Sequence, residues 1–223
     1  MLGRASKNGI LDIRAVNIRD FTQNKHKKTD DTPFGGGAGM VMSAQPVFDA
    51  LRSVDAQDKR ILYMSPRGRK LDRDLVTDLA AEENLVILCG HYEGIDERII
   101  DFWKPEEISI GDYILTGGEL AAMVVVDAVA RMIPSVLGNQ ESHMEESVYS
   151  GLIEYPQYTK PRVYEEMEVP EVLLSGNHKL IHLWKFEKAC EITKERRPDL
   201  WEAFVRDLSG LTKDERKIVA RLR

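Results

Sequence analysis

The chain of 223 residues is 43% hydrophobic and 30% charged, which is typical of a soluble globular protein of one large or two small domains. Its apolar runs are too short for a membrane span, and its first residues lack the apolar segment of a signal peptide. Two cysteines do not make a disulfide framework, so we expect a reducing cytoplasm and no membrane association.

The net charge of −6 argues against a phosphate-binding surface over the whole chain. The basic residues are nevertheless concentrated in three clusters, and a local cluster of this kind can bind folded RNA. From the pattern alone, a solvated loop or helix face explains each cluster equally well. The clusters are Asn24–Lys28, Arg67–Lys70 and Lys194–Arg197.

The N-terminal part of the chain alternates between β-type runs and helical patterns. Strands are predicted at Ile10–Ile18, Val41–Met42, Arg60–Met64, Leu85–Cys89 and Ile108–Leu115, with a turn at Ser65–Gly68. Helices are predicted at Gln45–Leu51, at Asp72–Ala81, from Asp96 through Asp101, and at Glu119–Ile133 before Pro134. Strands that alternate with helices predict an α/β domain with a largely parallel sheet.

The stretch 135–169 has a different character from what precedes it. It is aperiodic, with glycines, prolines and acidic pairs, and it is longer than ordinary connections, which is typical of a functional loop or linker. We therefore predict three parts: an α/β domain at 1–137, an interdomain linker at 138–169, and a small all-helical domain at 170–223.

Helix boundary signals support the last of these parts. Asn177 can cap a helix that extends to about Lys194, and Pro198 suits the first position of another helix. Thr212 and Glu215 have the spacing of a capping box before a final helix.

Two glycine-bracketed turns are the most informative local feature. One spans 89–98 and the other 110–119, and each ends where a helix can begin. Glycine lets the backbone approach a ligand closely and adopt a positive φ without strain. Two such turns at the ends of neighbouring strands predict a small-molecule pocket lined by backbone N–H and C=O groups. The third glycine run, Gly35–Gly39, has neither P-loop nor dinucleotide-binding spacing, and a flexible hairpin loop explains it equally well.

Both glycine turns resemble the corresponding segments of bacterial tRNA (guanine-N1)-methyltransferases of the SPOUT class. The blocks 30–40, 63–70 and 173–178 carry the same resemblance. All five blocks occur in the order in which that family has them, and together they cover nearly the whole chain.

The resemblance implies a fold, a cofactor and a cofactor site. The fold would be a SPOUT-like α/β domain whose C-terminal part is threaded into a trefoil knot, followed by the helical domain. The cofactor would be S-adenosylmethionine, bound by three segments whose residues are Tyr63, Met64, Ser65, Pro66, Gly90, Tyr92, Ile110, Gly111, Asp112, Tyr113, Ile114, Leu115, Gly117 and Gly118. From the pattern alone, the second and third segments are equally compatible with ordinary core strands.

The chemistry of guanine N1 methylation requires that the N1 proton leave as the ring attacks the methyl group. A carboxylate can accept that proton, and a cation near O6 stabilises the charge on the base. By resemblance, the cation is Arg131 and the carboxylate, an Asp in that family, corresponds to Glu146. Glutamate is longer by one methylene, so Glu145 is an alternative base, and Glu93 is a further catalytic candidate. Gly36 and Gly39, together with Arg131, are the residues implied for holding the target guanosine.

Each catalytic candidate also has a structural explanation. Glu145 and Glu146 fit a solvated acidic loop, Glu93 fits a turn, and Arg131 has the i,i+4 spacing for an ion pair with Asp127. An inactive relative that binds RNA or cofactor as a dimer remains an alternative, as does a methyltransferase for another RNA base or a ribose hydroxyl.

The resemblance also implies partners. They are tRNA, with methylation of the guanosine immediately 3′ of the anticodon, and a second copy of the chain in a homodimer. Magnesium is included only as an assisting ion, and no metal site is predicted, because His178 and His182 lack a third ligand. Family members usually begin with a strand and a helix before the segment that matches Leu2–Ala5. Because that opening is absent here, we expect an unpaired sheet edge. Either the recorded start of the sequence lies downstream of the true start, or the protein is truncated.

Overall fold

The computed structural model describes residues 1–137 and 151–223. The chain divides into two compact units, Met1–Asn139 and Gln140–Arg223, and each is described by itself. None of the helices in the described ranges has the length and hydropathy of a membrane span.

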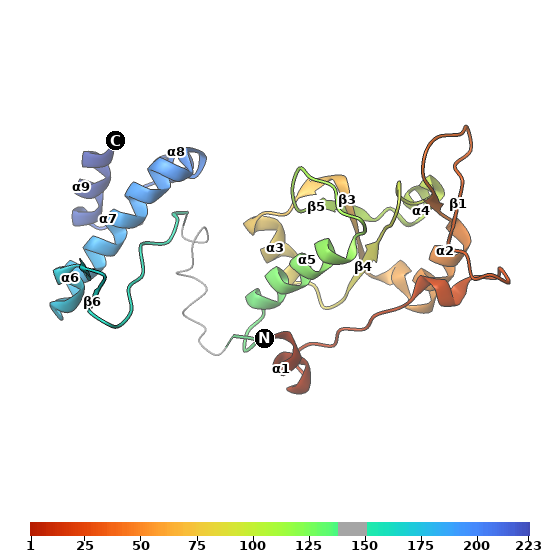
Figure 1. The fold of residues 1–223 in the computed structure, drawn as a ribbon, viewed down its shortest axis with the longest axis horizontal. Coiled ribbons are helices and arrows are strands. Elements are labelled where there is room, and N and C mark those ends of the chain that lie inside the picture. The colour runs from red at the N-terminus through yellow and green to blue at the C-terminus, as the bar shows by residue number, and fades with distance from the viewer. Residues whose placement is uncertain (138–150) are drawn as a thin grey trace. The chain divides into compact units, whose positions relative to one another are not determined.

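The first unit is built on a parallel sheet of the order β4-β3-β5 (Figure 1). Strand β3 (Arg60–Lys70) pairs with β4 (Leu85–Cys89) on one side and with β5 (Glu106–Ser109) on the other. Because all three strands run in the same direction, their carboxyl ends meet at one edge of the sheet. The predicted α/β class with a parallel sheet is confirmed.

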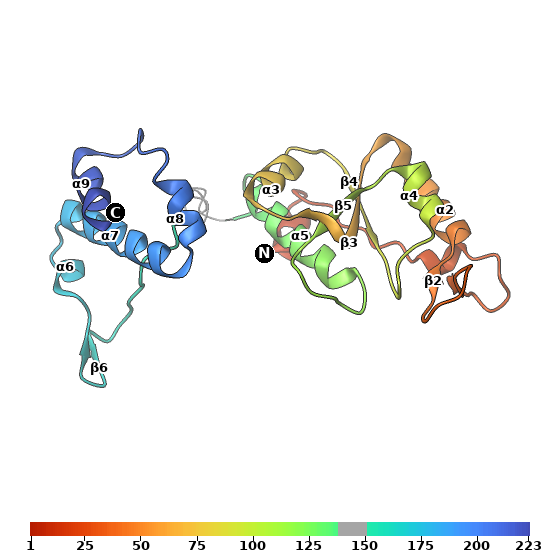
Figure 2. The ribbon, with the colours of Figure 1, turned by 90° about the horizontal axis from the view of Figure 1, so that it is seen from above.

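Alternating residues of β3 supply two separate cores. Ile61 and Tyr63 pack with α2 (Ala44–Ser53) and α4 (Glu97–Trp103). Leu62 and Met64 point to the opposite face and pack with α3 (Arg73–Ala80) and α5 (Glu119–Met132). The sheet is therefore the middle layer of three, as Figure 2 shows.

Arg60 holds the amino end of β3, opposite the carboxyl edge. Its guanidinium lies 2.8 Å from Asp78, 3.2 Å from Glu82 and 2.7 Å from Glu106. These carboxylates come from α3, from the residues after it and from β5. Arg60 thus ties three segments together at the end of the sheet that does not carry the glycine turns.

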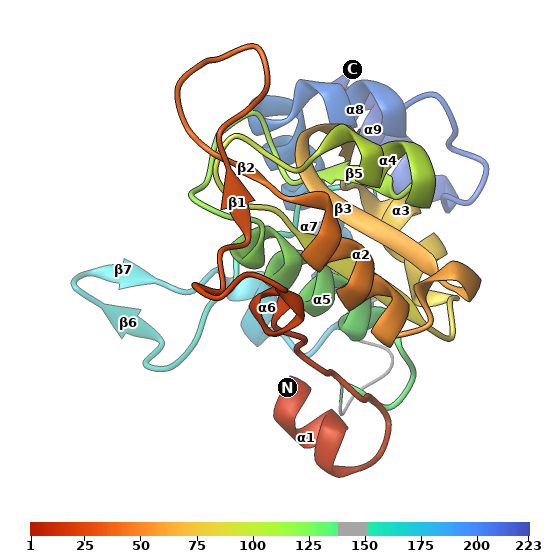
Figure 3. The ribbon, with the colours of Figure 1, turned by 90° about the vertical axis from the view of Figure 1, so that its right-hand side faces the viewer.

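Two short elements and an antiparallel ribbon complete the first unit. Helix α1 (Leu2–Lys7) packs Ala5 against Ala130 of α5 and against Val136, which is 1% exposed. The 3-10 helix η2 spans Ala56–Asp58. Strands β1 (Asp30–Asp31) and β2 (Val41–Met42) form the ribbon, and the loop between them carries the glycine run and projects from the ribbon (Figure 3).

Three strand predictions need correction. Residues 11–17 have no regular structure and lead into the 3-10 helix η1 (Ile18–Phe21), so the strand predicted at Ile10–Ile18 is wrong. Ile13 and Val16 are 53% and 43% exposed, because no neighbouring strand in the described residues gives them a surface to pack against.

The other two corrections concern β3 and β5. No turn ends β3 at Ser65–Gly68. Instead the strand continues to Lys70 and meets β5 a second time, with Arg69 opposite Ile108. Gly68 permits this approach, since a Cβ there would lie 2.2 Å from the carbonyl carbon of Glu107. Strand β5 ends at Ser109, and the remainder of the stretch predicted as strand to Leu115 is loop.

The second unit contains an antiparallel ribbon and four helices in the described residues. The ribbon is β6 (Val163–Tyr164) with β7 (Met167–Glu168), and the helices are α6 (Glu171–Leu174), α7 (His178–Arg196), α8 (Pro198–Phe204) and α9 (Lys213–Leu222). Their core includes Cys190, Trp201 and Val219.

The helix boundary predictions for this unit are confirmed. Asn177 accepts a hydrogen bond from the amide of Leu180 at 3.2 Å, and Pro198 is the first residue of α8. Thr212 and Glu215 form both halves of the capping box.

Residues of the predicted linker also join this unit. Leu152 is 5% exposed in its core, and the amide of Ile153 donates to Thr193 Oγ1 at 2.7 Å. The limits 138–169 and 170–223 remain predictions, since a two-stranded ribbon precedes the helices.

Candidate functional site

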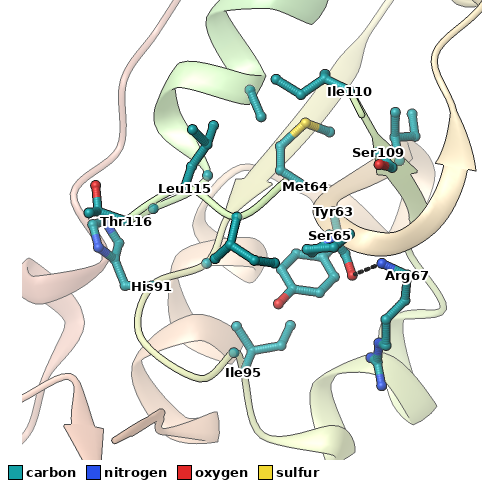
Figure 4. A pocket seen from close by; sticks show the side chains of 18 of the residues that line it. Tyr63, Met64, Ser65, Arg67, His91, Ile95, Ser109, Ile110, Leu115 and Thr116 are labelled. Atoms are coloured by element: carbon teal, nitrogen blue, oxygen red, sulfur yellow. Dashed lines mark hydrogen bonds between the residues drawn. The ribbon is translucent and has the colours of Figure 1, made fainter. Parts of the chain in front are cut away.

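A pocket of about 500 Å³ lies at the carboxyl edge of the sheet, within the usual size range of small-molecule sites (Figure 4). Residues 63–67 of β3, where its pairing with β5 is interrupted, and the turns that follow β4 and β5 form its wall. Because β3 is the central strand, the two turns lie on either side of its end. Ligands of open parallel sheets bind at this kind of edge.

The structure brings nearly all of the predicted cofactor-binding residues together at this pocket. Those that line it are Tyr63, Met64, Ser65, Pro66, Gly90, Tyr92, Ile110, Gly111, Tyr113, Ile114, Leu115, Gly117 and Gly118. Asp112 is the exception, because it is not among the lining residues and its carboxylate lies 2.7 Å from Lys70 Nζ. Their role as cofactor ligands stays a prediction.

Backbone atoms of the two glycine turns approach each other closely. The amide of Gly118 donates to the carbonyl of Gly90 at 2.8 Å. A Cβ on Gly118 would lie 2.9 Å from the Cα of Cys89, and a Cβ on Gly90 would lie 2.9 Å from the ring of Tyr63. These contacts require glycine at both positions, and the lack of a side chain there leaves backbone polar groups accessible to a ligand.

Tyr63 and two serines supply the polar side chains at the end of β3 and β5. Burial raises the pKa of the Tyr63 phenol, so it stays a protonated donor at neutral pH. Ser65 Oγ accepts a hydrogen bond from the amide of Arg67 at 3.2 Å, and Ser109 Oγ lies 3.1 Å from the carbonyl of Gly111. Both serines are nearly buried and stabilise the local turns.

Several lining residues were not predicted from the sequence. They are Arg67, His91, Gly94, Ile95, Glu97, Ile108, Ser109, Thr116 and Ala121. Arg67 and His91 lie inside the motifs that carried the family resemblance, and these motifs could have identified them as lining residues. Glu97 lies inside one of these motifs as well. Ile108 and Ala121 belong to a neighbouring strand and helix, so only the three-dimensional structure shows that they reach the pocket.

Glu93 lies where the pocket meets the glycine loop. It lines the pocket, and its amide donates to the carbonyl of Met40 at 3.0 Å. A Cβ on Gly39 would lie 2.5 Å from Glu93 Cγ, so the structure brings these two predicted residues together. Gly36 lies farther along the loop with φ of +80°, and a Cβ placed on it would have no neighbouring atom within 4 Å.

The other catalytic candidates do not line this pocket. Arg131 is in the last turn of α5, and it is not a lining residue. Glu145 and Glu146 fall in the stretch 138–150, outside the described residues.

The three basic clusters differ in how their cations are engaged. Arg67, Arg69 and Lys70 each pair with a carboxylate, and in the third cluster Arg197 pairs with Asp199. In the first cluster, the side chains of Lys25, Lys27 and Lys28 are exposed and make no ion pair with any described residue. The lysines of the first cluster are therefore available to phosphates.

Residues 1–137 and 151–223 contain no candidate metal site. No group of three or more His, Cys, Asp or Glu side chains in these ranges could hold an ion. His182, one of the two helical histidines, instead lies 2.9 Å from Glu215 Oε1.

Comparison with known proteins decides the family. The family model described as tRNA (Guanine-1)-methyltransferase TrmD matches residues 1–203. The chain belongs to this family. The resemblance carried by the five sequence blocks is thereby confirmed, and so is the class of enzyme, a methyl-group transferase.

Curated relatives match nearly the whole chain. A protein of Clostridium acetobutylicum is 52% identical over 220 residues, covering 98% of this chain and 88% of its own length. One of Alkaliphilus oremlandii is 53% identical over 213 residues, covering 92% and 86%. One of Clostridium tetani is 49% identical over 221 residues, covering 99% and 90%. Each of them is named tRNA (guanine-N(1)-)-methyltransferase.

Proposed function

We propose that the protein methylates N1 of a guanine in tRNA with S-adenosylmethionine as the methyl donor. The observation that carries this proposal is the pocket at the carboxyl edge of the sheet, where three segments far apart in the sequence meet. Its volume, its buried floor and its closely spaced glycine backbones suit a nucleoside held by backbone hydrogen bonds. We propose that the predicted residues at this edge bind the cofactor.

The bound cofactor supplies a methyl group on a positively charged sulfur. Glu93 and Glu97 line the pocket, and their carboxylates favour a cation there. When the N1–C bond forms and the C–S bond breaks, the N1 proton must pass to a base, and S-adenosylhomocysteine is released. We assign proton removal to Glu146 and stabilisation of the charge at O6 to Arg131, with Glu93 orienting the guanine edge.

The target guanosine would enter beside the loop Gly35–Gly39. Gly39 contacts Glu93, so this end of the loop lies directly at the pocket. Phe34 is fully exposed at the start of the glycine run, where its ring can stack on a neighbouring base. The exposed lysines of Asn24–Lys28, which precede β1, can bind phosphates of the same RNA. We infer that the target is the guanosine immediately 3′ of the anticodon and that the reaction occurs in the cytoplasm.

A second copy of the chain would cover an apolar face of α5. Leu120, Met123 and Val124 share one side of this helix and are 58%, 65% and 47% exposed. Exposed apolar patches of this kind mark association sites. We propose a homodimer through this face, a knotted strand–loop arrangement in the first unit, and tRNA binding by the helices after residue 170.

The decisive experiment is methyl transfer from labelled S-adenosylmethionine to tRNA transcripts with G or A immediately 3′ of the anticodon, with and without Mg²⁺. Label on the G transcript alone, recovered as 1-methylguanosine, is the expected result. Label on both transcripts would mean another RNA target, and for a ribose hydroxyl Glu146→Ala would change little. Cofactor binding without transfer would favour a non-catalytic relative.

A further inference from the structure

The two glycine turns are joined at one point by both backbone and side chains. His91, after β4, forms an antiparallel bridge with Gly117, after β5. His91 Nε2 lies 2.5 Å from Oε1 of Glu119, the first residue of α5. A Cβ on Gly117 would lie 2.6 Å from Glu119 Oε2 and 2.7 Å from His91 Cε1, so this pair lies directly over the Gly117 backbone.

The pair is close to the ligand site without being buried in it. His91 lines the pocket, next to Thr116 of the other turn (Figure 4). Its side chain is 43% exposed and that of Glu119 is 57% exposed. An interaction at this location can fix the distance between the two turns while solvent still reaches both groups.

The charge on Glu119 can be assigned from its surroundings. Burial acts to raise the pKa of Glu119, but hydrogen bonds from His91 and from the backbone outweigh it, so the pKa lies below its ordinary value. The start of a helix also favours a carboxylate. The carboxylate is therefore charged throughout the neutral range.

Three other polar groups lie around the pair. Burial and the charge of Glu119 raise the pKa of the Cys89 thiol to about 11, so it stays neutral. The ring of Tyr92 lies 5.9 Å from that of His91, and Glu93 is two residues along the same turn.

We propose that His91 and Glu119 act as positioning residues, an electrostatic latch that holds the two glycine turns at the spacing the cofactor requires. The proposal rests on the proposed function of the pocket. Without either side chain the two turns would be joined by backbone contacts alone, and affinity for the cofactor would fall.

The test is the dissociation constant of S-adenosylhomocysteine, measured by calorimetry for the wild-type protein and for variants of the pair. Exposed pairs of this kind contribute up to about 1 kcal/mol, so His91→Ala and Glu119→Gln should each bind about two- to fivefold more weakly. His91→Arg can still donate to Glu119 and should restore most of the wild-type affinity.

Asp199→Asn is the matched control, because it removes an exposed ion pair with Arg197 in the second unit. It should leave the affinity for S-adenosylhomocysteine unchanged. A thermal melt of each variant checks that the chain is folded.

Two results would overturn the latch. One is wild-type affinity in His91→Ala and Glu119→Gln, and the other is an affinity of His91→Arg as low as that of His91→Ala. No detectable binding by the wild-type protein would instead contradict the proposed function, so the two failures are distinguishable.

Discussion

Glycine has different surroundings in the pocket turns and in the loop Gly35–Gly39. At Gly90 and Gly118, a Cβ would collide with neighbouring atoms, so those turns are held by contact. At Gly35 and Gly36, φ is positive and no atom lies within 4 Å of the Cβ position. The pocket is thus formed before any ligand binds, whereas the loop has the backbone freedom to adjust to one. We expect cofactor binding and tRNA recognition to separate along this division.

The largest effect is expected at Glu93, where the two sets of glycines meet. Glu93→Gln keeps the shape of the side chain and removes its charge. If Glu93 orients the guanine, the rate constant of methyl transfer should fall about 10²- to 10⁴-fold, as for lost acid–base groups. Affinity for S-adenosylhomocysteine should change little. Single-turnover kinetics with saturating cofactor measure the rate, and an unchanged rate would remove Glu93 from catalysis.

A side chain at Gly118 should damage the pocket alone. Gly118→Val places atoms against the backbone of Cys89, and relieving such overpacking costs about 1–3 kcal/mol, or roughly 5- to 150-fold in affinity. We expect that loss in affinity for S-adenosylhomocysteine, measured by calorimetry. Gly36→Val is the matched control, since its surroundings are open and the strain of a side chain at φ of +80° falls on the loop. It should bind the cofactor normally, and a comparable loss of cofactor affinity there would contradict the comparison.

Removing the exposed ring beside the glycine loop should affect tRNA alone. Phe34→Ala should lower kcat/KM for tRNA about tenfold, because stacking on a base contributes about 1–3 kcal/mol. Phe34→Tyr should restore most of it. Since the Phe34 side chain is fully exposed, the melting temperature and cofactor affinity should be unchanged. Equal activity of the Ala and Tyr variants would exclude stacking.

The smallest effect is expected from a single lysine of Asn24–Lys28. Lys27→Gln should weaken tRNA binding a few-fold at low salt and reduce the slope of log affinity against log salt by about one. Filter binding over a range of salt concentrations measures the slope. Arg69→Gln is the comparison, because Arg69 already pairs with Asp72. A larger change in slope for Arg69→Gln would contradict the division between available and paired cations.

The sequence predicted those elements whose signals are local. Leu85–Cys89 is a strand with the bounds expected from its apolar run, and the capping box at Thr212 begins a helix as its spacing indicated. The strand expected at Ile10–Ile18 failed because a strand needs a neighbour, which a local pattern cannot supply.

The pocket was predictable to the extent that it lies in motifs. The glycine turns marked most of its wall, and the family resemblance added the end of β3. The ion pair of His91 with Glu119 joins residues 28 positions apart, so it depends on how β4 and β5 lie beside β3. Neither periodicity nor composition carries that information.

Val136 and Leu152 are buried residues on either side of the stretch that contains the proposed base. Val136 packs in the core of the first unit, and Leu152 in that of the second. In the sequence, Glu146 is six residues from Leu152 and ten from Val136. The proposed base is therefore connected to the helical unit by the shorter segment of chain. Residues added between Glu146 and Leu152 would lengthen that segment, and residues added nearer Val136 would not.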